Sequence, residues 1–216
     1  MSILEKPAEV NTPINGLLAR RWSPRAFDSR DVEPEKLRAL FEAARWSASS
    51  GNQQPWYFLI GTSDDPENFK KVLECLVESN QAWAKNAPVL GLTVAALKFA
   101  NSDQNNRYAF HDVGQAMAYL TVEAMDQGLF VHQMGGILPD KAREVFQIPE
   151  GYEAVAGFAI GYRGDPSSLP DKLRQRELAA RVRKPMQEFV FSGQWGKTAS
   201  MAKPKAERKA KHPGRR

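Results

Sequence analysis

The chain has 216 residues, of which 42% are hydrophobic and 25% charged, ordinary values for a globular protein that can bury a substantial core. Its single cysteine, Cys75, excludes an intramolecular disulfide and fits a reducing compartment. The formal charge of +5 belongs to the C-terminal end: residues 197–216 hold eight Lys/Arg and one Glu, which leaves −2 on the rest.

The two ends of the chain predict neither a membrane segment nor a nucleic-acid site. Residues 1–7 lack a basic start and an apolar run, and the longest apolar stretch, 88–97, is too short to span a bilayer. The basic tail, 197–216, has no large apolar residue after Met201 and no aromatic residue to stack on bases. We therefore expect one domain over 1–196, a disordered tail over 197–216, and a cytoplasmic protein.

The first half of the chain predicts three helices and two strands. An Asn, Glu or Asp followed by Pro within two residues marks the start of helices over 12–20, 34–46 and 66–78. Short apolar runs rich in aromatic and β-branched residues predict strands over 57–60 and 89–96.

The second half predicts a long helix, two strands and two short helices, after a polar loop over 98–106. Small and apolar residues at helical spacing predict a buried central helix that Gly128 ends. The expected elements are helices over 107–127, 139–146 and 170–180 and strands over 129–132 and 152–161.

Few, short strands alternate irregularly with helices along the chain. This pattern predicts an α+β fold with one mixed or mostly antiparallel sheet flanked by helices, rather than a regular doubly wound sheet. Residues 186–195 are apolar but lie beyond the last predicted core element, so we expect them to dock on a partner subunit.

The usual catalytic patterns of metal and nucleotide enzymes are missing from the sequence. His111, His132 and His212 have no carboxylate or cysteine at ligand spacing, so no metal site is expected. Phosphate-loop, nucleophile-elbow and dinucleotide fingerprints are also missing. An enzyme of this composition would need a cofactor to carry the chemistry, and we assign no catalytic residue.

Three features together point to a flat, phosphorylated cofactor. Cations cluster at 20–25 and again at 181–183, a loop at 49–54 is dense in hydroxyls and amides, and the pair Gly135-Gly136 lets backbone approach a ring. Taken singly, each feature is more often a solvated helix end or turn chemistry. A ring with several polar edges and one phosphate would use all three, which describes flavin mononucleotide (FMN).

The residues that carry these features resemble the nitroreductase family of FMN-dependent oxidoreductases. The resemblance begins with Arg-Arg-Trp-Ser-Pro-Arg-Ala-Phe-Asp at 20–28 and Ser-Ser-Gly-Asn-Gln-Gln-Pro-Trp at 49–56. Later segments follow in the expected order, so that the resemblance covers about 11–196: Asn80 to Ala87-Pro88, Asp112-Val113-Gly114, Met134-Gly135-Gly136 and Arg181-Val182-Arg183-Lys184-Pro185.

The resemblance implies an intertwined homodimer in which C-terminal segments embrace the partner and two FMN sites lie at the interface. It also implies a ping-pong reaction in which NAD(P)H reduces FMN, and the reduced flavin then reduces a small acceptor, often a nitroaromatic or a quinone.

Carried over by motif, the resemblance implies a role for each group of site residues. Arg21, Ser23, Arg181 and Arg183 would bind the phosphate and ribityl side, and Arg25 the pyrimidine edge. The loop at 49–54, called the serine loop below, would come from the partner subunit. Asn80 would contact the ring edge, and the backbone of Gly135-Gly136, the glycine pair, would face N5 of the flavin. The full expected set is Arg21, Trp22, Ser23, Arg25, Ser49, Ser50, Asn52, Asn80, Met134, Gly135, Gly136, Arg181 and Arg183.

Two other functions remain open at this point. The same scaffold can carry other flavin chemistry, such as dehydrogenation or reductive dehalogenation. A non-enzymatic protein that binds flavin, or that associates with nucleic acid through the basic tail, is the other alternative. Because Trp22 separates the first two arginines from Ser23, the phosphate could pair with either Arg20 or Arg21.

Overall fold

The computed structural model describes residues 4–204 and divides the chain into two compact units, Met1–Ala179 and Ala180–Arg216. Within its described part, the second unit contains two short 3₁₀ turns, Met186–Glu188 and Ser200–Ala202. The predicted basic tail begins inside this unit, and its residues from 205 onward lie outside the described part.

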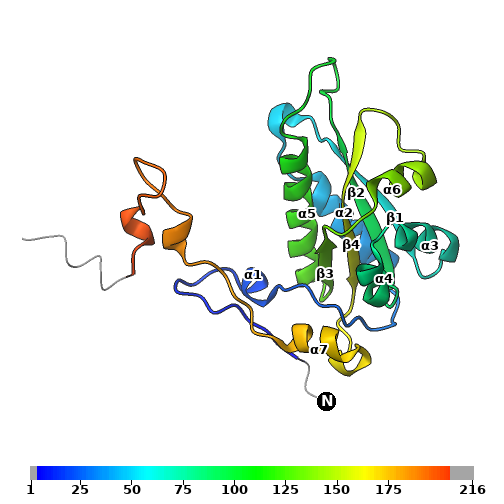
Figure 1. Ribbon diagram of the computed structural model, residues 1–216, viewed down its shortest axis with the longest axis horizontal. Coiled ribbons are helices and arrows are strands. Elements are labelled where there is room, and N and C mark those ends of the chain that lie inside the picture. Colours follow the sequence, from blue (N-terminus) through cyan, green and yellow to red (C-terminus); the bar gives the residue numbers. More distant parts are fainter. Residues whose placement is uncertain (1–3, 205–216) are drawn as a thin grey trace, which may run out of the picture. The chain divides into compact units, whose positions relative to one another are not determined.

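The first unit is built on one four-stranded sheet (Figure 1). Its strands are β1 (Trp56–Thr62), β2 (Val89–Ala96), β3 (Phe130–Met134) and β4 (Tyr152–Gly161), in the order β1-β2-β4-β3. Each neighbouring pair runs antiparallel, which confirms the predicted antiparallel sheet and the α+β fold.

Helices cover both faces of this sheet. On one face α2 (Pro34–Arg45) packs against the long α5 (Ala109–Asp126). The other face carries α3 (Pro66–Glu74), α4 (Glu78–Ala84) and α6 (Pro139–Phe146). Two further short helices, α1 (Gly16–Arg20) and α7 (Asp171–Leu178), lie near the N- and C-terminal ends of the first unit in sequence.

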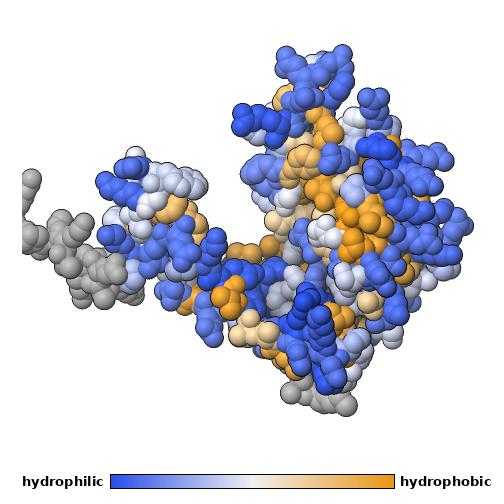
Figure 2. Space-filling view, in the orientation of Figure 1, coloured by the Kyte–Doolittle hydropathy of each residue, from blue (hydrophilic) through white to orange (hydrophobic). Residues whose placement is uncertain are grey.

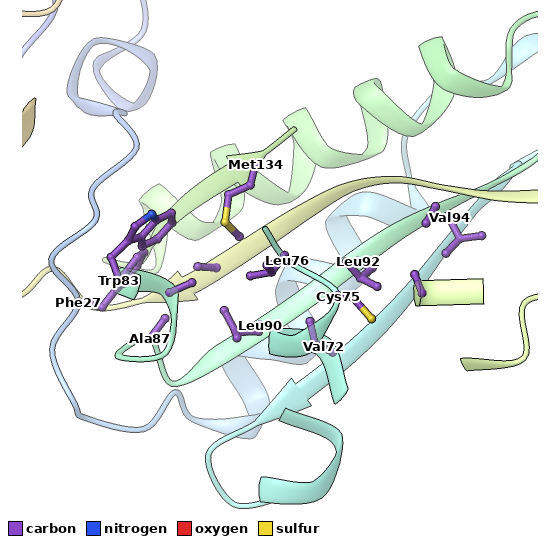
Figure 3. Close-up of a cluster of buried hydrophobic side chains, with 14 of the residues drawn as sticks. Phe27, Val72, Cys75, Leu76, Trp83, Ala87, Leu90, Leu92, Val94 and Met134 are labelled. Carbon is purple, nitrogen blue, oxygen red and sulfur yellow. The ribbon is translucent and has the colours of Figure 1, made fainter. Parts of the chain in front are cut away.

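Alternation along the strands divides most of the core into two large clusters, one on each face, beside a small third cluster of Ala95, Ala109 and Val113. Leu90, Leu92 and Val94 of β2 lie on the side of α3 and α4 and belong to one cluster with Trp83 and Met134 (Figure 3). On the opposite face, side chains of β3 and β4 pack against α2 and α5; these include Leu40, Met117, Leu120, Phe158 and Ile160. Cys75 lies fully buried in the first cluster, where it packs as a small apolar residue of the core.

Two of the predicted helix boundaries were wrong. The first helix begins at Gly16, because the Asn15 side chain accepts the Leu17 N–H at 2.8 Å and supplies the N-cap instead of the Asn11-Thr12 pair. The predicted helix over 66–78 is two helices, α3 and α4. Leu76 leaves helical geometry between them because it forms a β-bridge with Ile137, a contact that local sequence does not reveal.

In the described part of the chain, no helix combines the length and apolarity needed to cross a bilayer. The same residues hold no group of three or more metal-ligating side chains.

Gly91 of β2 supplies a test of the packing. A Cβ at this position would stand 2.1 Å from Cζ of Phe158, whose side chain is fully buried. We expect Gly91→Ala to lower the free energy of unfolding by about 1–3 kcal/mol, measured by urea denaturation, because the ring must shift within a close-packed core. The loss should shrink in a Phe158→Leu background. An equal loss in both backgrounds would show that the ring is not the obstacle.

Candidate functional site

The candidate site is built on the extended segment 21–26, which follows directly after α1. Arg21 caps α1 through its N–H, which donates to the Leu17 carbonyl at 2.9 Å, and its backbone is already extended. From there the side chains alternate, as an extended chain requires. Trp22, Pro24 and Ala26 are buried. The residues that alternate with them, Arg21, Ser23 and Arg25, are half-buried.

The half-buried side of this segment gathers the predicted polar residues. Arg21 Nη1 donates to Ser23 Oγ at 3.2 Å, so these two side chains form one unit. Among residues 4–204, the Arg25 guanidinium makes no hydrogen bond or ion pair. A row of two cations and a hydroxyl on one side of an extended strand is suited to an anionic ligand that lies along it.

The buried side of the segment anchors it to β3. The Trp22 ring packs edge-on against Phe130, with ring centroids 6.2 Å apart, and Lys6 Nζ lies 4.7 Å from the Trp22 ring. Trp22 is 5% exposed, so its ring faces the core rather than the polar side. Trp22 belongs to the expected site set, but of its groups only the backbone remains available to a ligand.

His132 of β3 holds the middle of the segment. Its Nδ1–H donates to the Pro24 carbonyl at 2.7 Å, and its ring centroid lies 4.4 Å from that of Trp83. The pKa of His132 is lowered from 6.5 to about 4, mainly by burial, with smaller contributions from the nearby Arg25 and Arg21 and against the opposing effect of its backbone bonds. The ring is therefore neutral near pH 7, with its proton on Nδ1 and a lone pair on Nε2.

Glu177 of α7 holds the same segment from another element, and sequence analysis missed it. Its carboxylate oxygens accept the Arg25 N–H at 3.0 Å each, and one of them accepts the Ala26 N–H at 3.1 Å. The side chain is buried although α7 is rich in charge and has little apolar face. Nothing local distinguishes this glutamate from its exposed neighbours, so only the three-dimensional contact identifies it.

The end of β3 and the start of α4 form the next part of the site. Asn80 Nδ2 donates to the Gly136 carbonyl at 3.0 Å, and the Val77 N–H donates to the same oxygen at 3.1 Å. A Cβ on Gly136 would stand 2.7 Å from Asn80 Nδ2, whereas a Cβ on Gly135 would meet nothing within 4 Å. Gly136 is thus required by packing, and Gly135 borders open space. The Met134 side chain is buried in the core (Figure 3), so only its backbone faces this region.

The serine loop lies elsewhere in the unit. The Ser50 N–H donates to the buried carboxylate of Asp112 at 3.0 Å, and Ser49 Oγ accepts the Gln54 N–H at 3.0 Å. Asn52 has a φ of 54°, and its side-chain oxygen accepts from Gln54 Nε2 at 3.2 Å. The loop is thus ordered by its own turn bonds and by Asp112, without contact to the segment 21–26.

Strand register shows how far apart the serine loop and the segment 21–26 lie along the strand direction of the sheet. The loop precedes Trp56, which pairs with Ala95 and through it reaches Glu153 of β4. The segment meets β3 at Phe130, which pairs with Gly161 at the other end of β4. Glu153 and Gly161 are eight residue steps apart along β4, which corresponds to about 25 Å. Figure 1 shows the same separation, with the loop and the segment at opposite ends of the sheet.

Arg181 and Arg183 belong to the second unit. Arg183 is exposed, and its Nη1 donates to the Val182 carbonyl at 2.7 Å. Arg181 is half-buried, and burial lowers the pKa of its guanidinium, with a smaller contribution from Arg183. Their expected role at the phosphate stays a prediction.

A surface cavity of about 790 Å³ on the first unit does not suit an anion. Arg143 lines it, but its guanidinium donates to the carbonyl oxygens of Ile148, Pro149 and Tyr152.

The neutral state of buried His132 predicts how stability depends on pH. Because its folded pKa of about 4 lies below the ordinary 6.5, the unfolded chain binds more protons between these values. Stability is therefore fully present above pH 6.5 and is lost as the pH falls toward 4. For this residue the loss between pH 7 and pH 5 is about 2 kcal/mol. Urea unfolding at both pH values should show this difference, and His132→Asn should remove it. An equal loss of stability between pH 7 and pH 5 in both proteins would contradict the lowered pKa of His132.

Comparison with known proteins gives a consistent family. A family model described as the nitroreductase family matches residues 18–162. The chain is 31% identical over 121 residues to an uncharacterized 15.4 kDa protein in the ask 5′ region of Mycolicibacterium smegmatis, covering 56% of this chain and 80% of that one. It is 45% identical over 53 residues to the major NAD(P)H-flavin oxidoreductase of Aliivibrio fischeri, a local match that covers 24% of each chain.

Among solved structures, the fold matches that of an oxidoreductase containing FMN. The TM-score is 0.82 with 35% identity, and the match covers 90% of this chain and 98% of the other. Since the family model spans more than half of the sequence, including the segment 21–26, the serine loop and the glycine pair, the chain belongs to the nitroreductase family.

Proposed function

We propose that the protein is an FMN-dependent oxidoreductase that takes reducing equivalents from NAD(P)H and passes them to a small acceptor such as a nitroaromatic or a quinone. Family membership and the similarity to an FMN-containing oxidoreductase support the flavin, and the local match to an NAD(P)H-flavin oxidoreductase supports the reductant. The observation that carries the proposal is the row of Arg21, Ser23 and Arg25 on one side of the extended segment 21–26, with the Arg25 guanidinium unpaired within residues 4–204.

The residues present suit FMN in both charge and shape. The cations on segment 21–26 match an anionic phosphate and an electron-rich ring edge. Gly135 leaves open the volume that a side chain would fill, and the nearby Asn80–Gly136 bond fixes the backbone there. When bound, FMN supplies the hydride chemistry.

The chain itself would bind and tune the cofactor. Arg21 and Ser23 would hold the phosphate and ribityl side, and Arg25 would hold the pyrimidine edge. A fixed guanidinium beside that edge stabilises negative charge there, and so raises the reduction potential of the flavin. His132, neutral near pH 7, adds no further positive charge to this side of the site.

We further propose that the working form is a homodimer in which the partner's serine loop completes each site. Within one chain the loop and the segment 21–26 are held about 25 Å apart along β4, so one chain does not assemble both. The first unit also exposes large aromatic side chains on or beside α5, namely Tyr108, Phe110 and Tyr119. Figure 2 shows apolar residues gathered on the visible face of the first unit, a pattern typical of surfaces that pair.

The first test is the visible spectrum of the purified protein. We expect bound FMN, or uptake of added FMN, and loss of the oxidised flavin band when NADH or NADPH is added without oxygen. A colourless protein that does not take up FMN would exclude this proposal and every other flavin-based function. A flavoprotein that NAD(P)H does not reduce would exclude the reductant alone.

The role of Arg25 is tested by the flavin potential. Arg25→Ala should lower the two-electron midpoint potential by about 30 mV or more, because the reduced flavin loses a fixed cation worth roughly 1.4 kcal/mol. The control is Arg38→Ala, which removes the same charge from an exposed position paired with Glu35 on α2. A potential equally affected in both variants, or in neither, would exclude a local role for Arg25.

Shared sites are tested by mixing two variants. Arg25→Ala alters the segment, and Ser50→Asp places a negative charge on the loop without removing the Ser50 N–H bond to Asp112. Each homodimer should bind FMN weakly, but a heterodimer regains one intact site and should bind about half of the normal amount. No recovery in the heterodimer would mean that each site uses the loop of its own chain.

A further inference from the structure

One peptide unit of the site is held at both of its polar ends. The carbonyl of Pro24 and the N–H of Arg25 belong to the same planar peptide group. His132 Nδ1–H donates to this carbonyl at 2.7 Å, and the Glu177 carboxylate accepts this N–H through both oxygens at 3.0 Å. The two side chains come from β3 and α7, so distant parts of the chain meet on a single backbone group.

Glu177 is itself firmly placed. Its side chain is among the largest that are fully buried in the first unit, at 1% exposure. A buried carboxylate is costly unless it is hydrogen-bonded, and here its oxygens accept the N–H groups of Arg25 and Ala26. Lys6 Nζ donates to the Glu177 backbone carbonyl at 2.6 Å, which fixes the end of α7 beside the segment.

We propose that Glu177 and His132 are positioning residues that set the orientation of the Pro24–Arg25 peptide plane, and with it the direction of the Arg25 side chain. A planar group bonded at its two opposite ends cannot rotate about the chain axis without breaking one bond. The dihedral angles on either side are then fixed, and so is the Cα–Cβ bond of Arg25. This proposal rests on the proposed function, in which Arg25 holds the flavin edge.

The two contacts differ in kind, which makes them separable by substitution. The carbonyl needs a donor, and Asn places its Nδ2 where histidine has Nδ1, so His132→Asn keeps the bond while His132→Leu removes it. The N–H groups need acceptors, so Glu177→Gln keeps one oxygen while Glu177→Met removes both at similar size. The matched control is Glu144→Gln, on the exposed side of α6.

The first readout is amide exchange in flavin-free protein, followed by NMR. In Glu177→Met the Arg25 and Ala26 amides should exchange at least about tenfold faster relative to the β-sheet amides, with a smaller effect in Glu177→Gln and none in Glu144→Gln. The NMR signal of the Arg25 side-chain Nε–H should shift in the same variants. Unchanged exchange and an unchanged Arg25 signal in folded Glu177→Met or Glu177→Gln would overturn the proposal.

The second readout is the flavin. Glu177→Met and His132→Leu should each weaken FMN binding by about tenfold and lower the flavin potential, while His132→Asn should retain most of both. In an Arg25→Ala background, the Glu177 and His132 substitutions should shift the potential no further, because they act through Arg25. A full additional shift in that background, or His132→Asn behaving like His132→Leu, would overturn the positioning role.

The two readouts separate this proposal from the proposed function. If the unaltered protein binds no FMN, the flavin function fails, yet the exchange and side-chain signals still decide whether Glu177 and His132 orient Arg25. If FMN binds and NAD(P)H reduces it, but both the exchange and the Arg25 signal are unchanged in the variants, the positioning role fails alone.

Discussion

The alternation of an extended backbone is the constraint on which the candidate site depends. Between Arg21 and Ala26 each residue faces the side opposite to its neighbour, so one run of sequence supplies both anchors and ligand-facing groups. Trp22 packs on Phe130, and Pro24 and Ala26 are buried on the same side, while Arg21, Ser23 and Arg25 are turned the other way. A slip of one residue would bury two arginines and expose a tryptophan, and the packing of Trp22 excludes it.

Buried carboxylates hold the backbone of both predicted halves of the site. Glu177 accepts the N–H groups of Arg25 and Ala26, and Asp112 accepts the N–H of Ser50. Both acids are about 1% exposed, and both satisfy main-chain donors that regular secondary structure leaves free. Side chains that face a ligand are therefore carried on backbone that is rigid for reasons unrelated to the ligand.

Sequence predicted the parts that are determined locally. Proline and capping residues marked the starts of α2 and α3, and apolar runs marked all four strands, because those signals act within a few residues. The segment 21–26 and the glycine pair were predicted as site residues, and the structure links the two through β3. The break between α3 and α4 was missed because it is caused by the distant bridge of Leu76 to Ile137.

Long-range contacts also explain what sequence could not supply about the site. Glu177 lies 152 residues from Arg25 in a helix whose sequence suggests only a solvated surface. Similarly, the separation of the serine loop from the segment follows from strand register, which no local pattern encodes. The burial of the Trp22 and Met134 side chains was hidden for the same reason, although both residues belong to the expected cofactor-binding set.

The long span between Arg25 and Glu177 has a consequence for the order in which the protein is made. A ribosome releases the N-terminal segment early, but α7 is nearly the last element of the first unit to emerge. The sheet and its covering helices can form before that point, since their strands precede α7 in the chain. The segment 21–26 thus acquires its final backbone geometry only when synthesis of the unit is almost finished. A nascent or prematurely ended chain would carry the framework of the fold without an assembled site.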